Sequence, residues 1–176
     1  PMEGWRRGMW FDRTGLPWVM PSPNMATLQT AMVYPGACLI EGTNLSEGRG
    51  TTRPFEIVGA PWIEPYAYAA RLEEGGVPGV AFRPLWFRPT FQKHSGRTCG
   101  GVQIHVLDRR RFLPFLTGIH LILSAARQAP EEFDWRREPY EFESGRLAVD
   151  LLAGGSWLRE AVEQGREAAS LPSMWT

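Results

Sequence analysis

The residues best suited to chemistry lie in one short stretch, Glu41–Thr52, which reads EGTNLSEGRGTT. It holds two carboxylates, one guanidinium, one amide and four hydroxyls, with three glycines between them. An apolar segment, Ala37–Ile40, precedes it, and Arg53–Val58 follows. A polar loop delivered by buried apolar segments is a common way to present functional groups from a rigid support. We therefore take this loop as the candidate site; the alternative is an ordinary surface loop whose Asn and Ser residues form local turns.

Two acidic residues of this loop, Glu41 and Glu47, are the predicted catalytic pair. Cleavage of a glycosidic bond commonly uses two carboxyl groups, one to protonate the leaving oxygen and one to act as base or nucleophile. The six-residue spacing does not fix their separation in space. For Glu41 the alternative is a structural ion pair with Arg49 or Arg53.

Arg49 is the residue of the loop best suited to bind a carboxylate. It stands between Gly48 and Gly50, which have no side chains to obstruct the approach of a ligand. A guanidinium grips a carboxylate through two parallel hydrogen bonds, which an ammonium does not do. We predict a substrate contact from Arg49; the alternative is that it braces the loop through Glu41 or Glu56.

The remaining predicted binding residues are small polar side chains and one histidine. The hydroxyls and the amide can donate and accept hydrogen bonds toward a sugar, or they can cap their own backbone. His94, which we expect to be exposed together with Lys93, is a possible proton carrier. No CxxC or HxxxH spacing occurs, so no metal site is predicted, and no cofactor either. The predicted substrate-binding set is Asn44, Ser46, Arg49, Thr51, Thr52 and His94.

A longer run around the loop, Tyr34–Glu56, resembles the signature of the exo-acting β-N-acetylmuramidases of bacteria, the NamZ-type family. Gly8–Asp12, Pro21–Met25 and Cys99–His105 fit the same pattern, so the resemblance extends from about residue 4 to the last predicted helix. It implies a cell-wall glycoside hydrolase that releases N-acetylmuramic acid from the non-reducing ends of peptidoglycan fragments. That sugar carries a lactyl carboxylate, which Arg49 is placed to recognise.

The resemblance also implies a two-domain layout with the site in a cleft between the halves. Residues 1–176 are then a single C-terminal domain, with an irregular lead-in at 1–24, and the missing N-terminal half is a Rossmann-like partner. We expect the enzyme to be incomplete without that half and the full-length protein to be secreted or periplasmic. The alternative is a non-catalytic module that binds muropeptides or docks a domain.

Composition excludes some partners. The formal net charge is zero, which gives no electrostatic basis for binding nucleic acid or an anionic membrane. No stretch approaches the ~18–20 apolar residues of a membrane span. Cys38 and Cys99 each lie beside an apolar run, where free buried thiols are expected.

The elements that must position the loop follow from periodicity and from proline and glycine. We expect a helix over 25–33, capped by Asn24 and ended by Pro35-Gly36, with Met25, Leu28 and Met32 on one face. Alternation predicts a strand over 102–106, and prolines make 80–91 an edge strand. Further strands or helices are expected at 55–58, 65–74 (with Tyr66, Ala69 and Ala70 inward), 109–128 (capped by Asp108), 147–152 and 156–165.

Short strands mixed with helices, without a repeated βαβ unit, predict the fold class. We expect an α/β fold of the mixed α+β kind, in which several helices pack on a small mixed sheet. In the lead-in, Trp5, Trp10 and Phe11 are expected to anchor an irregular segment on the surface.

Overall fold

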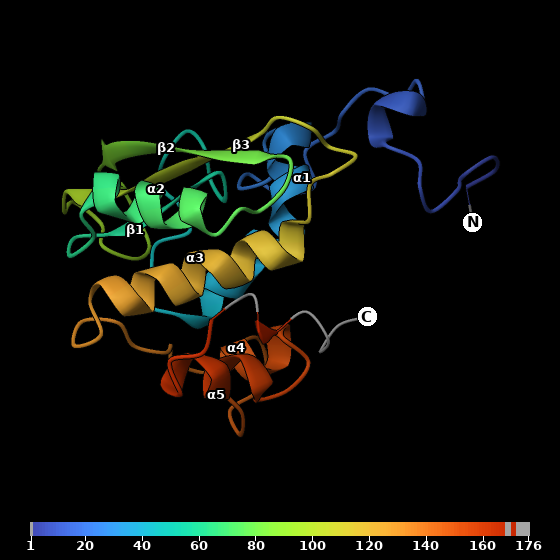
Figure 1. The fold of residues 1–176 in the computed structure, drawn as a ribbon. Helices are drawn as coiled ribbons and strands as arrows, with labels where there is room; N and C mark the ends of the chain where they lie inside the picture. Colours follow the sequence, from blue (N-terminus) through green and yellow to red (C-terminus); the bar gives the residue numbers. More distant parts are fainter. Residues whose placement is uncertain (1, 168–169, 172–176) are drawn as a thin grey trace.

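The computed structural model of the chain describes residues 2–167 and 170–171, where five helices pack around a three-stranded sheet (Figure 1). The mixed α/β fold predicted from the sequence is confirmed. The strands are β1 (Ile57–Ala60), β2 (Val80–Phe87) and β3 (Cys99–Val106). The helices are α1 (Leu28–Ala37), α2 (Pro65–Glu74), α3 (Pro114–Gln128), α4 (Ala148–Leu152) and α5 (Trp157–Glu163), with short 3-10 helices η1 (Phe11–Arg13) and η2 (Cys38–Gly42).

The sheet has the order β1-β3-β2 and is antiparallel throughout, so the expected mixture of parallel and antiparallel strands is wrong. β3 is central, pairing Val102 with Val58 of β1 and Ile104 with Phe82 of β2. Its Val102 and Ile104 are buried whereas Gln103 is half-buried, as the alternation predicted. β2 lies at an edge, where its proline needs no ladder partner.

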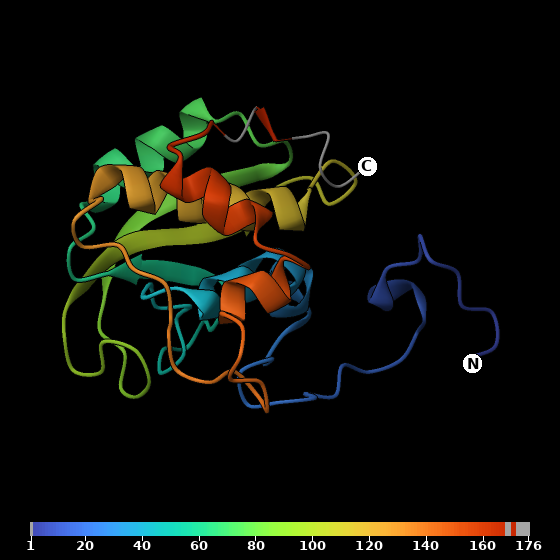
Figure 2. The ribbon, with the colours of Figure 1, turned by 90° about the horizontal axis from the view of Figure 1, so that it is seen from below.

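The helices cover the sheet and one another. α2 packs on β2 and β3, α3 packs against α1 and α2, and α4 packs against η2 (Figures 1 and 2). The core between these layers holds Tyr68, whose hydroxyl donates to the Leu121 carbonyl at 2.8 Å. A buried hydroxyl without such a partner would be costly, so this bond fixes α2 against α3.

Helix α1 crosses α3 with backbone against backbone. A methyl group added at Gly36 would lie 1.7 Å from the Pro114 carbonyl oxygen, and one at Gly118 would lie 2.2 Å from the Gly36 carbonyl oxygen. Only residues without a side chain allow this approach. Because α1 continues directly into η2, the crossing also fixes where the chain enters the Glu41–Thr52 loop.

Helix α2 has the predicted bounds, with Pro65 in its first turn and the Glu64 carboxylate accepting from two backbone N–H groups. Its buried face differs from the prediction in part. Ala69 is buried as expected, but Tyr66 is 69% exposed and Ala70 is exposed. The buried stripe has the spacing i, i+3, i+4 and i+7, and it consists of Pro65, Tyr68, Ala69 and Leu72.

Helix α1 starts later and ends later than predicted. It begins at Leu28 because the Thr27 hydroxyl, not Asn24, accepts from the Thr30 N–H at 3.1 Å. The predicted end at Pro35 is wrong, since the helix continues to Ala37. A proline in the last turn removes one backbone hydrogen bond there, and the 3-10 helix η2 follows at once.

Helix α3 begins at Pro114, five residues after the predicted start. Asp108 does cap a turn, accepting from the Arg110 N–H at 2.9 Å, but that turn precedes the helix. Pro114 stands in the first turn, where its missing N–H would have no helical partner.

The segment before α1 contains η1 and extends away from the rest of the molecule (Figure 1). Trp5 is exposed, so its predicted anchoring role is wrong. Contact with the body includes Arg109, which pairs with Asp12 at 2.7 Å and lies over the Trp10 ring. Within the part of the chain that the structure describes, no helix is long and apolar enough to cross a membrane.

Candidate active site

A cavity of about 460 Å³ lies where three loops meet, and the carboxylates of the Glu41–Thr52 stretch line it. The loops are 43–56, 88–98 and 129–147, which lie on one side of the molecule (Figure 2). Helix α1 contributes Tyr34, and η2 contributes Glu41. The lining consists of Tyr34, Glu41, Glu47, Arg49, Gln92, Lys93, Arg136, Pro139, Tyr140 and Glu141.

Glu41 stands in η2 and is only 7% exposed. Its Oε1 atom accepts from Nη2 of Arg49, and its Oε2 atom accepts from the Tyr140 hydroxyl at 2.7 Å. The ion pair with Arg49 that was the alternative for Glu41 is therefore present. Arg53 pairs instead with Glu56, at 3.4 Å. Glu41 is thus both neutralised by a cation and part of the cavity wall.

Glu47 is 3% exposed and lies between two cations. Its Oε1 atom accepts from Nε of Arg49 at 3.0 Å, and its Oε2 atom faces Nζ of Lys93 at 3.0 Å. One guanidinium therefore bridges both predicted catalytic carboxylates. This shared partner fixes the two acids relative to each other.

The glycines beside Arg49 have a structural reason. Gly48 and Gly50 adopt φ values of 75° and 80°, the left-handed region in which other residues are strained. A Cβ at Gly48 would also lie 2.6 Å from the Ile57 carbonyl oxygen. The loop can therefore fold back on β1 and turn Arg49 toward the acids only with glycine there.

Lys93 was expected to be exposed, and that prediction is wrong. The ammonium group donates to the Ile40 and Leu45 carbonyls at 3.0 and 2.9 Å, besides pairing with Glu47. Burial lowers the pKa of Lys93, and attraction to Glu47 opposes that shift. Its neighbours Gln92 and His94 have φ values of 65° and 57°, a strained backbone that points Lys93 inward.

Sequence reasoning missed several lining residues. Tyr34 and Tyr140 flank Glu41; burial and the hydrogen bond to Glu41 raise the pKa of Tyr140, and burial raises that of Tyr34. Arg136 lies over the Tyr140 ring, 5.6 Å from its centre. No local pattern marks Tyr140 or Arg136. For Lys93 a signal existed, because it is the one lysine in the sequence.

The hydroxyls of the loop mostly form hydrogen bonds with nearby backbone groups. The Ser46 hydroxyl accepts from the Gly48 N–H at 3.1 Å, and the Thr51 hydroxyl donates to the Gly48 carbonyl at 2.6 Å. Thr52 is exposed. None of the three lines the cavity. The structure therefore supports local capping, the alternative reading, for Ser46 and Thr51.

Asn44 and His94 line an adjoining cavity of about 500 Å³. The Asn44 amide donates to the Glu132 carbonyl at 2.7 Å, and the His94 ring nitrogen Nε2 lies 2.7 Å from the Asn44 carbonyl oxygen. Burial lowers the pKa of His94. Three residues line both cavities, which makes them neighbours: Gln92, Lys93 and Arg136.

The cysteines take no part in this site. Both are free, Cys99 buried and Cys38 half-buried, and burial raises the pKa of each thiol to about 11. Such thiols are poor nucleophiles at neutral pH. Among residues 2–167 and 170–171, no group of three or more histidine, cysteine or acidic side chains is arranged to hold a metal ion.

Comparison with known proteins connects this geometry to a family. The family model described as "Exo-beta-N-acetylmuramidase NamZ, C-terminal" matches residues 32–176. The chain belongs to the NamZ family. The corresponding NamZ N-terminal model matches residues 1–29, which include the segment before α1.

One NamZ relative is the peptidoglycan β-N-acetylmuramidase NamZ of Bacillus subtilis (strain 168). It is 44% identical over 170 residues, which make up 97% of this chain and 39% of the relative. The chain therefore spans about two fifths of the length of that protein.

Two solved structures from Bacteroides fragilis NCTC 9343 share the fold. The DUF1343 family protein BF0371 is 26% identical with a TM-score of 0.82, covering 98% of this chain and 44% of its own. The DUF1343 family protein BF0379 is 21% identical with a TM-score of 0.61, covering 89% and 39%, and it supports the fold alone.

Proposed function

We propose that this chain forms one wall of the active site of an exo-β-N-acetylmuramidase that releases N-acetylmuramic acid from the non-reducing ends of peptidoglycan fragments. Membership in the NamZ family supports the reaction class. The observation that carries the proposal is the convergence of Glu41, Glu47, Arg49 and Tyr140 on one cavity. Paired carboxylates beside a sugar-sized space are what glycoside hydrolysis requires.

The two carboxylates have different partners and therefore different roles. Each oxygen of Glu47 already faces a cation, so giving a proton to a leaving oxygen would require breaking an ion pair. Glu47 is better placed to stabilise positive charge that develops on the sugar ring, or to act as base or nucleophile. Glu41 is held by Tyr140 and Arg49 at the cavity wall. In this proposal it helps Glu47 to stabilise the positive charge that develops on the sugar ring.

The group that protonates the leaving oxygen then comes from the N-terminal half, across the cleft. This assignment agrees with the length of the chain, which spans 39% of its B. subtilis relative. We accordingly propose the N-terminal half as an obligatory partner.

Recognition of the lactyl carboxylate involves two arginines in this proposal. Arg49 is shared between two acids, which leaves it less free for a ligand than predicted. Arg136 also lines the cavity, and its ion pair with the exposed Glu138 is long, at 3.8 Å. Exposed ion pairs of this kind contribute little, so Arg136 can turn to the substrate.

The proposal is tested by Glu47→Gln in the full-length protein, because glutamine keeps the shape and removes the charge. We expect hydrolysis of a chromogenic N-acetylmuraminide to fall by about 100-fold or more while sugar binding is retained. Glu131→Gln, at an exposed acid that lines neither this cavity nor the adjoining one, is the matched control. Unchanged turnover in Glu47→Gln would move the chemistry to the other half.

A second test uses residues 1–176 alone. If the active site needs both halves, this fragment hydrolyses the same substrate far more slowly than the full-length protein. Equal rates would contradict the two-wall arrangement.

A non-catalytic role in binding muropeptides or docking a domain is the second candidate. The observation in its favour is that the charges of Glu41, Glu47, Arg49 and Lys93 already neutralise one another. Under this alternative, Glu47→Gln weakens sugar binding and turnover in parallel. Because peptidoglycan lies outside the cytoplasmic membrane, we also propose that the full-length protein is secreted or periplasmic, which fractionation of cells would test.

A further inference from the structure

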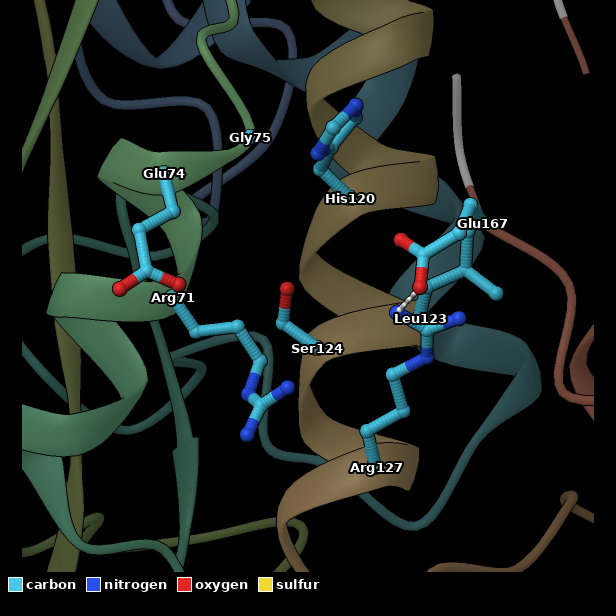
Figure 3. A pocket seen from close by; sticks show the side chains of 8 residues that line it. All are labelled: Arg71, Glu74, Gly75, His120, Leu123, Ser124, Arg127 and Glu167. Carbon is cyan, nitrogen blue, oxygen red and sulfur yellow. Dashed lines mark ion pairs between the residues drawn. The ribbon is translucent and has the colours of Figure 1, made fainter. Parts of the chain in front are cut away.

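A separate cavity of about 310 Å³ lies between α2 and α3 and shares no residue with the two cavities near Glu47 (Figure 3). Its inner wall comes from α3. His120 and Ser124 project from that helix into the space between the helices (Figure 3). The catalytic proposal makes no use of this cavity.

The inner wall holds two buried polar groups. His120 is 9% exposed and Ser124 is 6% exposed. Neither side chain makes a hydrogen bond to any residue that the structure describes. Neither is among the buried polar atoms that are closed off from solvent without a partner, so their polar atoms face the cavity. A polar ligand in the cavity can therefore take the place of water as their hydrogen-bond partner.

The imidazole lies close to Gly75, the residue that follows α2. A Cβ at Gly75 would lie 2.5 Å from Nδ1 of His120, so the ring has room only because that residue is glycine. Burial lowers the pKa of His120, and the Glu167 carboxylate opposes that shift. At neutral pH the ring is then uncharged, with one nitrogen able to donate and the other to accept.

The rim carries two charges of each sign. Arg127 is engaged, pairing with Glu167 at 2.5 Å and donating to the Gly165 carbonyl at 2.9 Å. Arg71 and Glu74 have no ion pair or hydrogen bond from their side chains within residues 2–167 and 170–171. One guanidinium and one carboxylate thus remain available in the same cavity.

We propose that this cavity binds a small zwitterion, an amino acid or short peptide, with its carboxylate on Arg71 and Ser124 and its ammonium group on Glu74. A guanidinium and a hydroxyl are good donors to a carboxylate. Because the rim charges sum to zero, a ligand that carries both signs complements the cavity better than a simple anion. A volume of about 310 Å³ accommodates a dipeptide-sized molecule.

Three probes test the charge requirement by calorimetric titration of the full-length protein. Alanylalanine carries both charges, acetate carries the carboxylate alone, and ethylamine carries the ammonium alone. We expect alanylalanine to bind and the two single-charge probes to bind about tenfold or more weakly. Equal binding of acetate and alanylalanine, or no binding of alanylalanine, would overturn the proposal.

Two variants locate the binding. Arg71→Gln removes the charge from an exposed helix position, and Gly75→Ala pushes the imidazole into the cavity; each should weaken alanylalanine binding by about tenfold or more. Arg7→Gln, at an exposed arginine that lines none of these cavities, should bind like the parent. A thermal unfolding midpoint shows that each variant is folded. Unchanged binding in Arg71→Gln would refute the assignment.

Discussion

The cavity at Glu47 and the cavity between α2 and α3 use their charged residues differently. In the first, Glu41, Glu47, Arg49 and Lys93 hold one another in place. In the second, two rim charges and two buried polar side chains have no partner among the described residues. Mutual pairing orients groups before a substrate arrives, which suits catalysis. Groups left unpaired suit reversible binding, because a ligand supplies their missing partners.

The largest effect that separates the two cavities should come from Arg49→Gln. This change leaves Glu41 and Glu47 buried and side by side without their shared cation. Removing one member of a buried ion pair is strongly destabilising, so we expect a loss on the order of 3 kcal/mol and of most activity. Chemical denaturation of the full-length protein measures the loss of stability, and hydrolysis of a chromogenic N-acetylmuraminide measures the loss of activity. A stability loss below about 0.5 kcal/mol would show that the pairing is not structural.

Tyr140→Phe is expected to have an intermediate effect. It removes only the hydroxyl that donates to Glu41 at 2.7 Å and leaves the ring under Arg136. A hydrogen bond to a charged group contributes about 1.5–3 kcal/mol at most, and less where solvent replaces it, so about 1 kcal/mol is expected. Tyr66→Phe, at an exposed tyrosine, is the control. Equal losses in the two variants would mean that the Tyr140 hydroxyl does not position Glu41.

A smaller effect concerns pH and His120. Burial lowers the pKa of His120 below its ordinary value, so the unfolded chain binds the proton more readily than the folded one. Stability should therefore fall as the pH drops through the ordinary value of about 6.5 toward the lowered folded value. Thermal midpoints between neutral and mildly acidic pH, compared with His120→Gln, isolate this contribution. The stability of His120→Gln should depend less steeply on pH than that of the parent. A steeper dependence would contradict the predicted direction of the His120 contribution.

The smallest effect is expected for Arg71→Gln on stability. Exposed substitutions away from networks usually change the free energy of unfolding by less than about 0.5 kcal/mol. The same exchange of arginine for glutamine should therefore lower the free energy of unfolding strongly at position 49 and hardly at all at position 71. Denaturation of the two variants side by side gives the comparison, and a large loss at 71 would show that Arg71 has a structural partner.

What the sequence could predict of this site depended on distance along the chain. Glu41, Glu47 and Arg49 were found because they lie within nine residues of one another. Tyr140 lies 99 residues from Glu41, and only the packing of α4 against η2 and the path of the loop before it bring them together. Arg136 was missed for the same reason.

The fold was predictable where local signals agreed with packing. Helix α2 has a proline at its start, and it begins and ends at the predicted residues. Its inward face was misread because the choice between Tyr66 and Tyr68 depends on where α3 lies, which no local pattern gives. Likewise, the stop expected at Pro35 failed because the approach of α1 to α3 stabilises a last helical turn that proline alone disfavours.

The crossing of α1 and α3 at Gly36 and Gly118 has a consequence for anyone screening this protein for loss of function. Neither glycine lines the cavity at Glu47, yet a single added carbon at either one would push the helices apart and shift the end of α1, and with it η2 and Glu41. Inactivating lesions should therefore map to these remote, chemically featureless positions as well as to the acids themselves.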